Sequence, residues 1–312
     1  MASAPHLPVL YQTIITALEP KSGGRYIDGT LGAGGHAAGI LAQSSPSGEL
    51  LGLDLDPQAL AIAHERLAPF GERAHIVQAS YTAMKIEAAK LAWDAVDGII
   101  LDFGVSSMQL DTPERGFSFL HSGPLDMRFT PNAPVSGAGT LSAADLVNTL
   151  PEDELANIIF RYGEERLSRK IARTIVNNRP IYTTTELADL ILKYIGKKER
   201  IHPATRTFQA LRIAVNNELE SVEMVLPLAV MLLKPGGRLA VISFHSLEDR
   251  LTKEYFRRES VDCICPPKQP ICTCNHKAII KELNRKPIEA DEAEKQDNSR
   301  SRSAKLRMAE KL

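Results

Sequence analysis

Short apolar runs and helical patterns alternate along the first hundred residues. The apolar runs cover 25–28 (RYID), 50–54 (LLGLD), 74–78 (AHIVQ) and 96–103 (VDGIILDF). Helical patterns lie between them at 37–43 and 57–67, and Pro57 stands at the first turn of the second, a common position for proline. The last apolar run has the character of a strand that is buried on both faces. This alternation predicts an α/β fold with a parallel, doubly wound sheet.

The alternation stops near residue 110 and resumes after residue 206. A Gly/Pro-rich stretch at 111–139 is followed by helical patterns at 143–150, 152–177 and 184–195, and Ser142 is a candidate N-cap for the first of them. Another helical stretch, 207–233, leads to a Lys-Pro-Gly-Gly turn and a fifth apolar run at 238–244. We therefore predict a discontinuous α/β domain (1–109 and 207–312) that carries an inserted all-helical domain (110–206). Residues 276–283 and 303–309 are predicted to form an edge hairpin, joined by the polar stretch 290–298.

Composition adds little to this picture, but the distribution of charge does. Hydrophobic residues make up 44% of the chain and charged residues 24%, as in ordinary globular proteins. No apolar run is long enough to span a bilayer and no secretory signal is visible, so we expect a cytoplasmic protein without a membrane partner. The net charge is −1, yet residues 161–212 hold twelve Lys/Arg against five Asp/Glu, a balance of +7. This basic segment is either an electrostatic footprint for nucleic acid or a set of solvated helix faces.

A glycine-rich turn at 28–36 (DGTLGAGGH) follows the first predicted strand and leads into the first helix. Glycines permit a tight turn and let a ligand approach the backbone, and the helix N-terminus offers free N–H groups. Asp54 ends the second strand, where its carboxylate can accept hydrogen bonds from both hydroxyls of a ribose; Asp56 suits the role of helix cap better. The turn and Asp54 fit NAD and S-adenosylmethionine alike, because residues 32–37 also match a G-x-G-x-x-A dinucleotide pattern.

Three features favour S-adenosylmethionine over NAD. The turn begins with Asp28, which suits the amino group of a methionine moiety and would repel a pyrophosphate. Asp102 ends the fourth strand, where it can face the adenine edge or the reacting group. Residues 233–239 (LKPGGRL) resemble the turn before strand five of class I methyltransferases. An acidic site also suits the cationic sulfonium of the methyl donor. An NAD-dependent oxidoreductase is the first alternative, but this function does not explain the basic insertion.

Six longer motifs carry a family resemblance: DGTLGAGGH (28–36), DFGVSS (102–107), ERGFSF (114–119), GPLDMR (123–128), HPATRTFQ (202–209) and SFHSLEDR (243–250). With these motifs the chain resembles the bacterial MraW (RsmH) family, whose members methylate N4 of a cytosine in the decoding centre of 16S rRNA. The resemblance runs from about His6 to Ala309. It implies a class I (Rossmann-like) methyltransferase sheet and S-adenosylmethionine as cofactor. It also implies 16S rRNA in the small (30S) ribosomal subunit as partner, and a substrate-recognition role for the helical insertion.

The resemblance further implies a set of cofactor contacts. In the family the cofactor is held by the Gly-Gly-His of the turn and by polar residues, at positions that fall here on Gly34, Gly35, His36, Asp54, Asp102 and Gln109. An aromatic residue after the third strand completes the set; the family often has Phe there, whereas this chain has Tyr81. Tyrosine keeps the ring that can pack against adenine, so Tyr81 is included.

Asp102 is the candidate catalytic residue. The lone pair of cytosine N4 is delocalised into the ring, so a site must align this nitrogen with the methyl group and offer acceptors to its N–H groups. Methyltransferases that act on exocyclic amines often carry Asp/Asn-Pro-Pro-aromatic after strand four. Here the stretch is DFGV (102–105), which keeps the acid and lacks both prolines. Whether Asp102 serves the amine, the cofactor or both is left open.

Two other sets of residues have alternative interpretations. Phe117, Phe119 and Phe129 either stack on an unstacked target base or form the local core of a long loop. His245 follows the fifth strand, where it either contacts substrate or stands at the entry of a helix that Ser246 is expected to cap.

All four cysteines lie within 263–274, in the pattern C-x-C…C-x-C. In a reducing compartment this pattern indicates reduced thiols or a metal clip rather than a disulfide framework. The spacing is tighter than that of common zinc motifs, so we predict no metal site and keep a structural zinc at Cys263, Cys265, Cys272 and Cys274 as an alternative. A non-enzymatic RNA-binding or ribosome-assembly factor is the second alternative function, against which the three acids count. A homodimer is left open.

Overall fold

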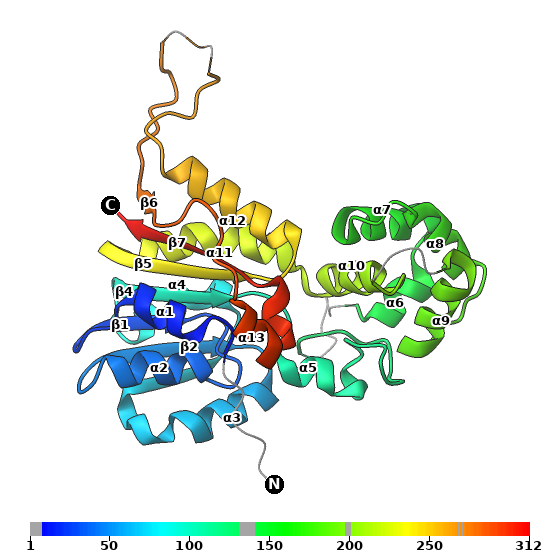
Figure 1. Cartoon of the computed structure of the whole chain (residues 1–312), viewed down its shortest axis with the longest axis horizontal. Coiled ribbons are helices and arrows are strands. Elements are labelled where there is room, and N and C mark those ends of the chain that lie inside the picture. The colour runs from blue at the N-terminus through cyan, green and yellow to red at the C-terminus, as the bar shows by residue number, and fades with distance from the viewer. Residues whose placement is uncertain (1–7, 131–140, 197–200, 268, 270) are drawn as a thin grey trace. The chain divides into compact units, whose positions relative to one another are not determined.

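The computed structural model describes residues 8–130, 141–196, 201–267, 269 and 271–312. The chain divides into two compact units (Figure 1): an α/β unit, Met1–Gly104 with Leu219–Leu312, and a helical unit, Val105–Glu218. The helical unit therefore starts before and ends after the predicted insertion of 110–206. It includes α5 (Ser107–Asp111) and α10 (Thr205–Asn216), and α10 buries three side chains in its core: Phe208, Leu211 and Val215. Every helix within the described ranges is too short or too polar to serve as a transmembrane span.

The α/β unit is built on one seven-stranded sheet of order β3-β2-β1-β4-β5-β7-β6. The strands are β1 (Arg25–Asp28), β2 (Glu49–Asp54), β3 (Ala74–Gln78), β4 (Val96–Asp102), β5 (Leu233–Ser243), β6 (Ile280–Glu282) and β7 (Lys305–Lys311). The first five are parallel, and β7 runs antiparallel to both β5 and β6. The predicted parallel sheet and edge hairpin are confirmed. The last two strands are shifted or shorter than predicted, because part of the 276–283 segment lies outside the ladder.

Apolar residues of the central strands point alternately to two helical layers. Ile99 and Leu101 of β4 join a core with α4 (Met84–Lys90), α11 (Glu218–Leu232) and α12 (Ser246–Glu259). Ile100 points to the opposite core, formed with α1 (Tyr11–Leu18), α2 (Gly35–Gln43) and α3 (Pro57–Leu67). All three β4 side chains are fully buried, so burial of this strand on both faces is confirmed. The remaining elements of the unit are α13 (Glu292–Asp297) and three 3₁₀ turns, η1 (Ala68–Arg73), η2 (Tyr81–Ala83) and η4 (Ser299–Ser303).

The helical unit has its own hydrophobic core. Besides α5 and α10 it contains η3 (Pro113–Arg115), α6 (Ala143–Thr149), α7 (Glu152–Gly163), α8 (Ser168–Val176) and α9 (Thr184–Ile195). The predicted single helix at 152–177 is wrong: α7 ends at Glu164, whose φ of 51° is left-handed, and α8 begins after a short loop. Asn217, with a φ of 49°, similarly divides the predicted stretch 207–233 into α10 and α11. Ser142 caps α6 as predicted.

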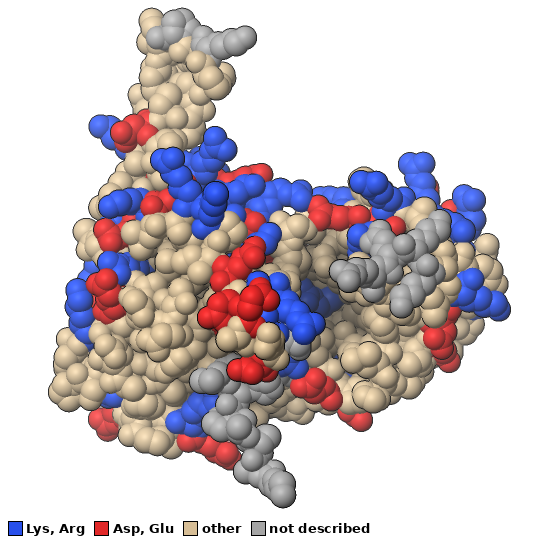
Figure 2. Space-filling model, in the orientation of Figure 1, with Lys and Arg blue, Asp and Glu red and all other residues tan. Residues whose placement is uncertain are grey.

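Helix α8 separates apolar and basic residues onto opposite faces. Ile171 and Ile175 are fully buried, whereas Arg169, Lys170 and Arg173 are exposed. Figure 2 shows Lys and Arg side chains along the edge of the molecule where α7 and α8 lie. The basic residues of the predicted insertion therefore include a solvent-facing group on this helix.

The three phenylalanines of the long loop belong to the core of the helical unit. Phe117 is buried and stacks on Phe129 at a ring-centroid distance of 5.8 Å. Phe119 contacts Phe208 edge-on at 4.8 Å and is only partly buried. Of the two interpretations given by the sequence, the packing agrees with the local core.

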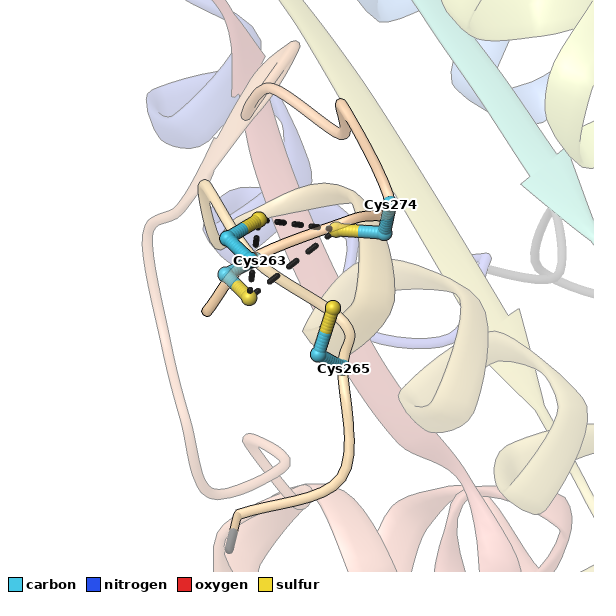
Figure 3. Close-up of side chains that lie close together, drawn as sticks. Cys263, Cys265 and Cys274 are labelled. Atoms are coloured by element: carbon cyan, nitrogen blue, oxygen red, sulfur yellow. Dashed lines mark hydrogen bonds between the residues drawn. The ribbon is translucent and has the colours of Figure 1, made fainter. Parts of the chain in front are cut away.

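The segment between α12 and β6 carries the four cysteines (Figure 3). Two of them are exposed and two are half-buried, and all four are free thiols. The segment projects from the α/β unit as an extended excursion between these two elements (Figure 1).

Candidate active site

Three acids stand at the carboxyl ends of adjacent strands in the α/β unit. Asp28, Asp54 and Asp102 are the last residues of β1, β2 and β4. Strand β1 lies between β2 and β4, and Asp28 is level with Ile100 of β4. The order of the strands reverses between β1 and β4, and ligands of doubly wound sheets bind in the crevice at such a switch point. The predicted acids therefore meet at the edge of the sheet where a ligand is expected.

The glycine-rich turn connects β1 to α2 beside these acids. Gly32 and Gly34 have φ angles of 50° and 75°, in the left-handed region that favours glycine. A Cβ atom at Gly34 would also lie 3.3 Å from the Leu67 side chain, so the turn has little room there. No side chain caps the N-terminus of α2 at Gly34. The first N–H groups of α2 are therefore suited to hydrogen bonding with a ligand.

Asp54 fastens the turn to the end of β2. One carboxylate oxygen accepts a hydrogen bond from the Gly32 amide at 2.7 Å, and the other accepts one from the Asp56 amide at 2.8 Å. Each oxygen has a second lone pair, so the carboxylate can also accept hydrogen bonds from ribose hydroxyls. Burial raises the pKa of Asp54 despite these amide donors. Asp56 caps α3 by accepting a hydrogen bond from the Gln58 amide, so the predicted role of Asp56 as the helix cap is confirmed.

His36 and Asp102 bring buried polar atoms without protein partners into the site. Among the described residues, neither ring nitrogen of His36 has a hydrogen-bond partner, and the same holds for Asp102 Oδ1. The His36 Nε2 and Asp102 Oδ2 atoms lie 3.9 Å apart. Burial lowers the pKa of His36 to about 3, so the imidazole is neutral at physiological pH. Buried polar atoms are normally hydrogen-bonded, and these three atoms therefore fit a polar ligand.

The electrostatics of the acids depends on burial and on their closeness to one another. Burial raises the pKa of Asp28 to about 7, with a further rise from the charge of Asp54 and an opposing effect of the Thr30 amide. The pKa of Asp102 is raised well above its usual range by burial and by the charges of Asp28 and Glu248. A cation in the crevice would lower both pKa values, since it favours the ionised carboxylates. The site is therefore suited to a positively charged ligand.

The remaining two predicted contacts are Tyr81 and Gln109. Tyr81 opens η2 after β3, is partly buried against the core of the α/β unit, and lies 5.8 Å from the Phe103 ring. Gln109 belongs to the helical unit, where it is buried and completes the capping box of α5: its side-chain oxygen accepts from the Ser106 amide at 3.0 Å. For Tyr81 and Gln109, contact with the cofactor stays a prediction.

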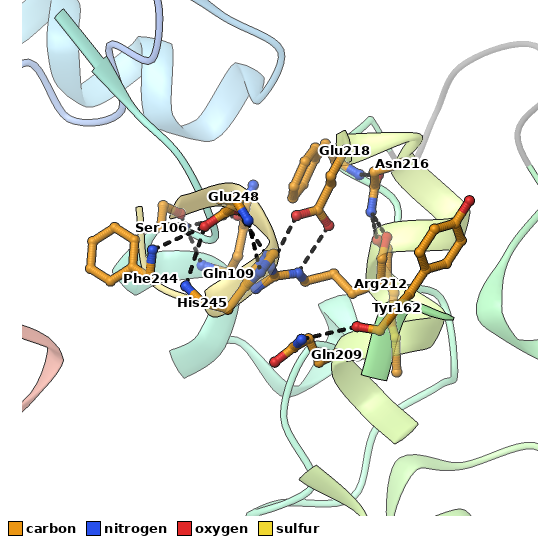
Figure 4. A network of polar contacts seen from close by, with 12 residues as sticks. Ser106, Gln109, Tyr162, Gln209, Arg212, Asn216, Glu218, Phe244, His245 and Glu248 are labelled. Carbon is orange, nitrogen blue, oxygen red and sulfur yellow. Dashed lines mark hydrogen bonds and ion pairs between the residues drawn. The ribbon is translucent and has the colours of Figure 1, made fainter. Parts of the chain in front are cut away.

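The start of α12 corrects the predicted helix cap. The N-cap is His245 rather than Ser246: His245 Nδ1 accepts from the Glu248 amide at 3.4 Å. Glu248 in turn accepts from the amides of Phe244, at 2.9 Å, and His245 (Figure 4). His245 is the N-cap because α12 begins at Ser246, so the serine already lies inside the first turn of the helix. His245 thus has a structural role at this turn.

Glu248 is an acid of the site that the sequence reasoning missed. Its side chain is only 1% exposed, and its charge raises the pKa of Asp102. Its position three residues after His245 matches the capping-box pattern, which is the signal that could have identified it. Glu218 is another buried acid drawn in Figure 4, and it accepts two hydrogen bonds of 2.9 Å from Arg212.

Tyr11 and Thr30 were also missed. The Tyr11 ring stacks on His36 at a centroid distance of 6.2 Å, and Thr30 Oγ1 accepts a hydrogen bond from the Asp102 amide. Thr30 therefore links the end of β4 to the turn after β1. No local sequence pattern indicates these contacts, because each joins residues from different elements of the fold.

This strand order, with an antiparallel β7 between β5 and β6 and acids after β1, β2 and β4, is that of the class I S-adenosylmethionine-dependent methyltransferases. The chain belongs to the MraW methylase family, whose model matches residues 3–312. The predicted fold, cofactor and class of enzyme are therefore confirmed, and the NAD-dependent and non-enzymatic alternatives are set aside.

Two sequence relatives of similar length support the assignment. The chain is 53% identical to the ribosomal RNA small subunit methyltransferase H of Citrifermentans bemidjiense over 313 residues, covering 98% of each chain. It is 50% identical to the protein of that name from Dehalococcoides mccartyi, covering 100% of this chain and 88% of the relative. Among solved structures, an rRNA methylase from Streptococcus thermophilus is similar with a TM-score of 0.41 and 11% identity, covering 97% of this chain and 93% of the other.

Proposed function

We propose that this methyltransferase transfers a methyl group from S-adenosylmethionine to N4 of a cytosine in 16S rRNA, within the small ribosomal subunit. This proposal rests on the cluster of Asp28, His36 and Asp102. Three buried polar atoms of the cluster have no hydrogen-bond partner among the described residues. The names of these relatives supply the class of RNA. A ribosomal substrate implies a cytoplasmic location. Light scattering of the intact chain tests whether it acts as a monomer or a homodimer.

The chain's own residues divide the work of holding the cofactor and receiving the base. Gly34, Gly35 and the first N–H groups of α2 would hold the methionine moiety together with Asp28, and Asp54 would accept hydrogen bonds from the ribose. When bound, S-adenosylmethionine supplies an electrophilic methyl group on a cationic sulfur. Neutral His36 can donate one hydrogen bond and accept another, as a site for a zwitterionic ligand requires.

Asp102 is the residue proposed to act on the amine. An acceptor at the N4 N–H groups lets the nitrogen pyramidalise and its lone pair turn towards the methyl group. The cofactor would supply the methyl group that bonds to N4, and its sulfur would keep the electron pair of the broken C–S bond. N4 then loses a proton, and the Asp102 carboxylate, whose ionised form a cation in the crevice favours, is the group proposed to accept it.

Substitution of Asp54 tests the proposed ribose contact. Asp54→Asn removes the charge and one acceptor, and we expect the dissociation constant for S-adenosylmethionine to rise about ten- to a hundredfold, the equivalent of one or two hydrogen bonds to a charged group. Asp56→Asn is the matched control, because asparagine is an equally good N-cap and should leave the affinity unchanged. Calorimetry measures both; equal affinities in the two variants would contradict the role of Asp54.

The exposed basic face of α8 is proposed to bind RNA phosphates. We expect the double variant Arg169→Ala/Lys170→Ala to weaken binding to 16S rRNA about tenfold and to flatten the plot of log K against log salt by about one to two units, because each lost phosphate contact contributes about 0.7–0.9. Lys21→Ala, at an exposed lysine of the α/β unit, serves as control. An unchanged salt slope in the double variant would show that this face is merely solvated.

A transfer assay tests the proposed reaction itself. Tritiated S-adenosylmethionine is incubated with unmethylated 30S particles and, separately, with protein-free 16S rRNA. The expected product is N4-methylcytidine, identified by mass spectrometry of nucleosides against a C5-methylated standard. Methylation of another base, or of a ribosomal protein, would refute the assignment of substrate. A preference between the two RNA preparations shows whether the assembled subunit is required.

A further inference from the structure

The excursion between α12 and β6 lacks a hydrophobic core of its own. From Ser260 to Ile279, none of the described residues is buried. Val261, Ile264 and Ile271 are all more than 40% exposed, so apolar burial contributes little to holding this segment in one conformation. Ordering such a chain segment costs conformational entropy, which some other interaction must offset.

The four cysteine sulfurs converge inside this segment (Figure 3). The Sγ atoms of Cys272 and Cys263, and those of Cys272 and Cys274, are 3.6 Å apart; those of Cys263 and Cys274 are 3.9 Å apart. With Cys265 included, all four sulfurs lie within 4.8 Å of one another. A disulfide requires about 2.05 Å, so these are separate thiols. Four sulfurs placed tetrahedrally at the zinc–thiolate distance of about 2.3 Å are roughly 3.8 Å apart, close to the observed spacing.

Backbone amides on both arms point at sulfur. The Ile264 amide donates to Cys274 Sγ at 3.4 Å, and the Thr273 amide donates to Cys265 Sγ at 3.5 Å. Each donor therefore sits within one C-x-C arm and reaches a cysteine of the other. Such N–H groups stabilise negative charge on sulfur, as a metal-binding thiolate requires.

The nearby histidine is already engaged, so sulfur is the whole donor set. His276 Nδ1 lies 2.8 Å from the Val261 carbonyl oxygen, and its Nε2 lies 3.4 Å from a carboxylate oxygen of Glu259. Neither ring nitrogen is directed to the sulfurs. Four thiolates in tetrahedral order are typical ligands of zinc and leave no open coordination position for catalysis.

We propose that Cys263, Cys265, Cys272 and Cys274 bind one structural zinc ion that clips the two arms of this excursion together. The proposal adopts the structural-zinc alternative in place of the prediction of no metal site, and it does not depend on the proposed RNA substrate. Ile280 pairs with Lys311, and the neighbouring Glu310 pairs with Arg238 of β5. The excursion thus rejoins the sheet about four residues before Ile242 of β5, which lies level with Asp102. The zinc site is separate from the methyl-transfer site.

Metal analysis of the full chain, purified without a histidine tag under reducing conditions, tests the proposal. We expect about one zinc per chain and no iron. Cys272→Ser should lose the metal, whereas Thr273→Ser, the neighbouring conservative change, should keep it. Cobalt added to the metal-free protein should give the visible absorption of tetrahedral cobalt thiolate, and this absorption should be absent from Cys272→Ser.

Two further measurements distinguish the loss of metal from a loss of folding or of cofactor binding. Trypsin should cleave between Cys263 and Lys277 much faster after chelation, while the circular dichroism and the affinity for S-adenosylmethionine stay the same. Folded, metal-free protein with four freely titrating thiols, or with disulfides detected by mass spectrometry, would overturn the proposal. So would zinc retained in full by Cys272→Ser.

Discussion

Asp102→Asn is expected to lower kcat by a factor of about 10²–10³ at saturating S-adenosylmethionine. The amide keeps the shape of the side chain and one acceptor, but it cannot take a proton from the amine. The acidic limb of the pH–rate profile should disappear with the carboxylate. The measurement is kcat across pH on 30S particles, together with the dissociation constant of the cofactor by calorimetry, because Asp102 is also proposed to contact the cofactor.

The two roles proposed for Asp102 predict different results. A variant that binds cofactor weakly but turns over normally once saturated would restrict Asp102 to binding and end its catalytic role. Asp94→Asn is the matched control: Asp94 is exposed shortly before β4, and its loss should change neither quantity.

Asp28→Asn is expected to stabilise the ligand-free protein and to lower its affinity for the cofactor. Asp28 has an ordinary pKa of 3.8, and burial raises it in the folded protein to about 7. Between these values the unfolded chain gives up its proton first, so the free energy of unfolding falls as pH rises, by about 1.4 kcal/mol per unit, and levels off above pH 7. Asparagine does not titrate, and its oxygen can still accept from the Thr30 amide.

Urea unfolding at pH 5 and pH 8 measures this effect. We expect the gain in stability of the variant to be on the order of 1–2 kcal/mol at pH 5 and to grow to on the order of 4 kcal/mol at pH 8. Its affinity for S-adenosylmethionine should fall about tenfold or more, and the wild-type affinity should improve from pH 6 to pH 8 as Asp28 ionises. Identical pH dependence of the free energy of unfolding in both proteins would show that folding does not raise the pKa of Asp28. Asp94→Asn again serves as control.

Much of the α/β unit could be predicted because its signals are local. The runs at 25–28 and 74–78 match β1 and β3, and the helix at 57–67 matches α3, since Asp56 and Pro57 mark its start. An acid directly after a buried run is likewise visible in one sequence, so Asp28, Asp54 and Asp102 could be assigned to one sheet edge.

The misses share a different cause. The break after α7 depends on Glu164 adopting a left-handed conformation, which the sequence does not announce as a glycine there would. The partnership of Glu248 with Phe244 and His245 follows a capping box whose first residue is a histidine, an uncommon cap. The convergence of the cysteines depends on how two short arms fold over each other, which spacing alone does not determine.

The interrupted sheet has a consequence for how the molecule is made. Ile99 of β4 pairs with Leu239 of β5, and the whole of Val105–Glu218 lies between them in the chain. During synthesis the nascent chain must therefore hold an incomplete sheet, open at β4, until the segment that contains β5 emerges. Within the intervening unit, α7 packs on α8, which follows it in the chain, and on α10, so these partners have all been made before β5 emerges. We infer that the inserted unit acquires its structure before the unit that surrounds it.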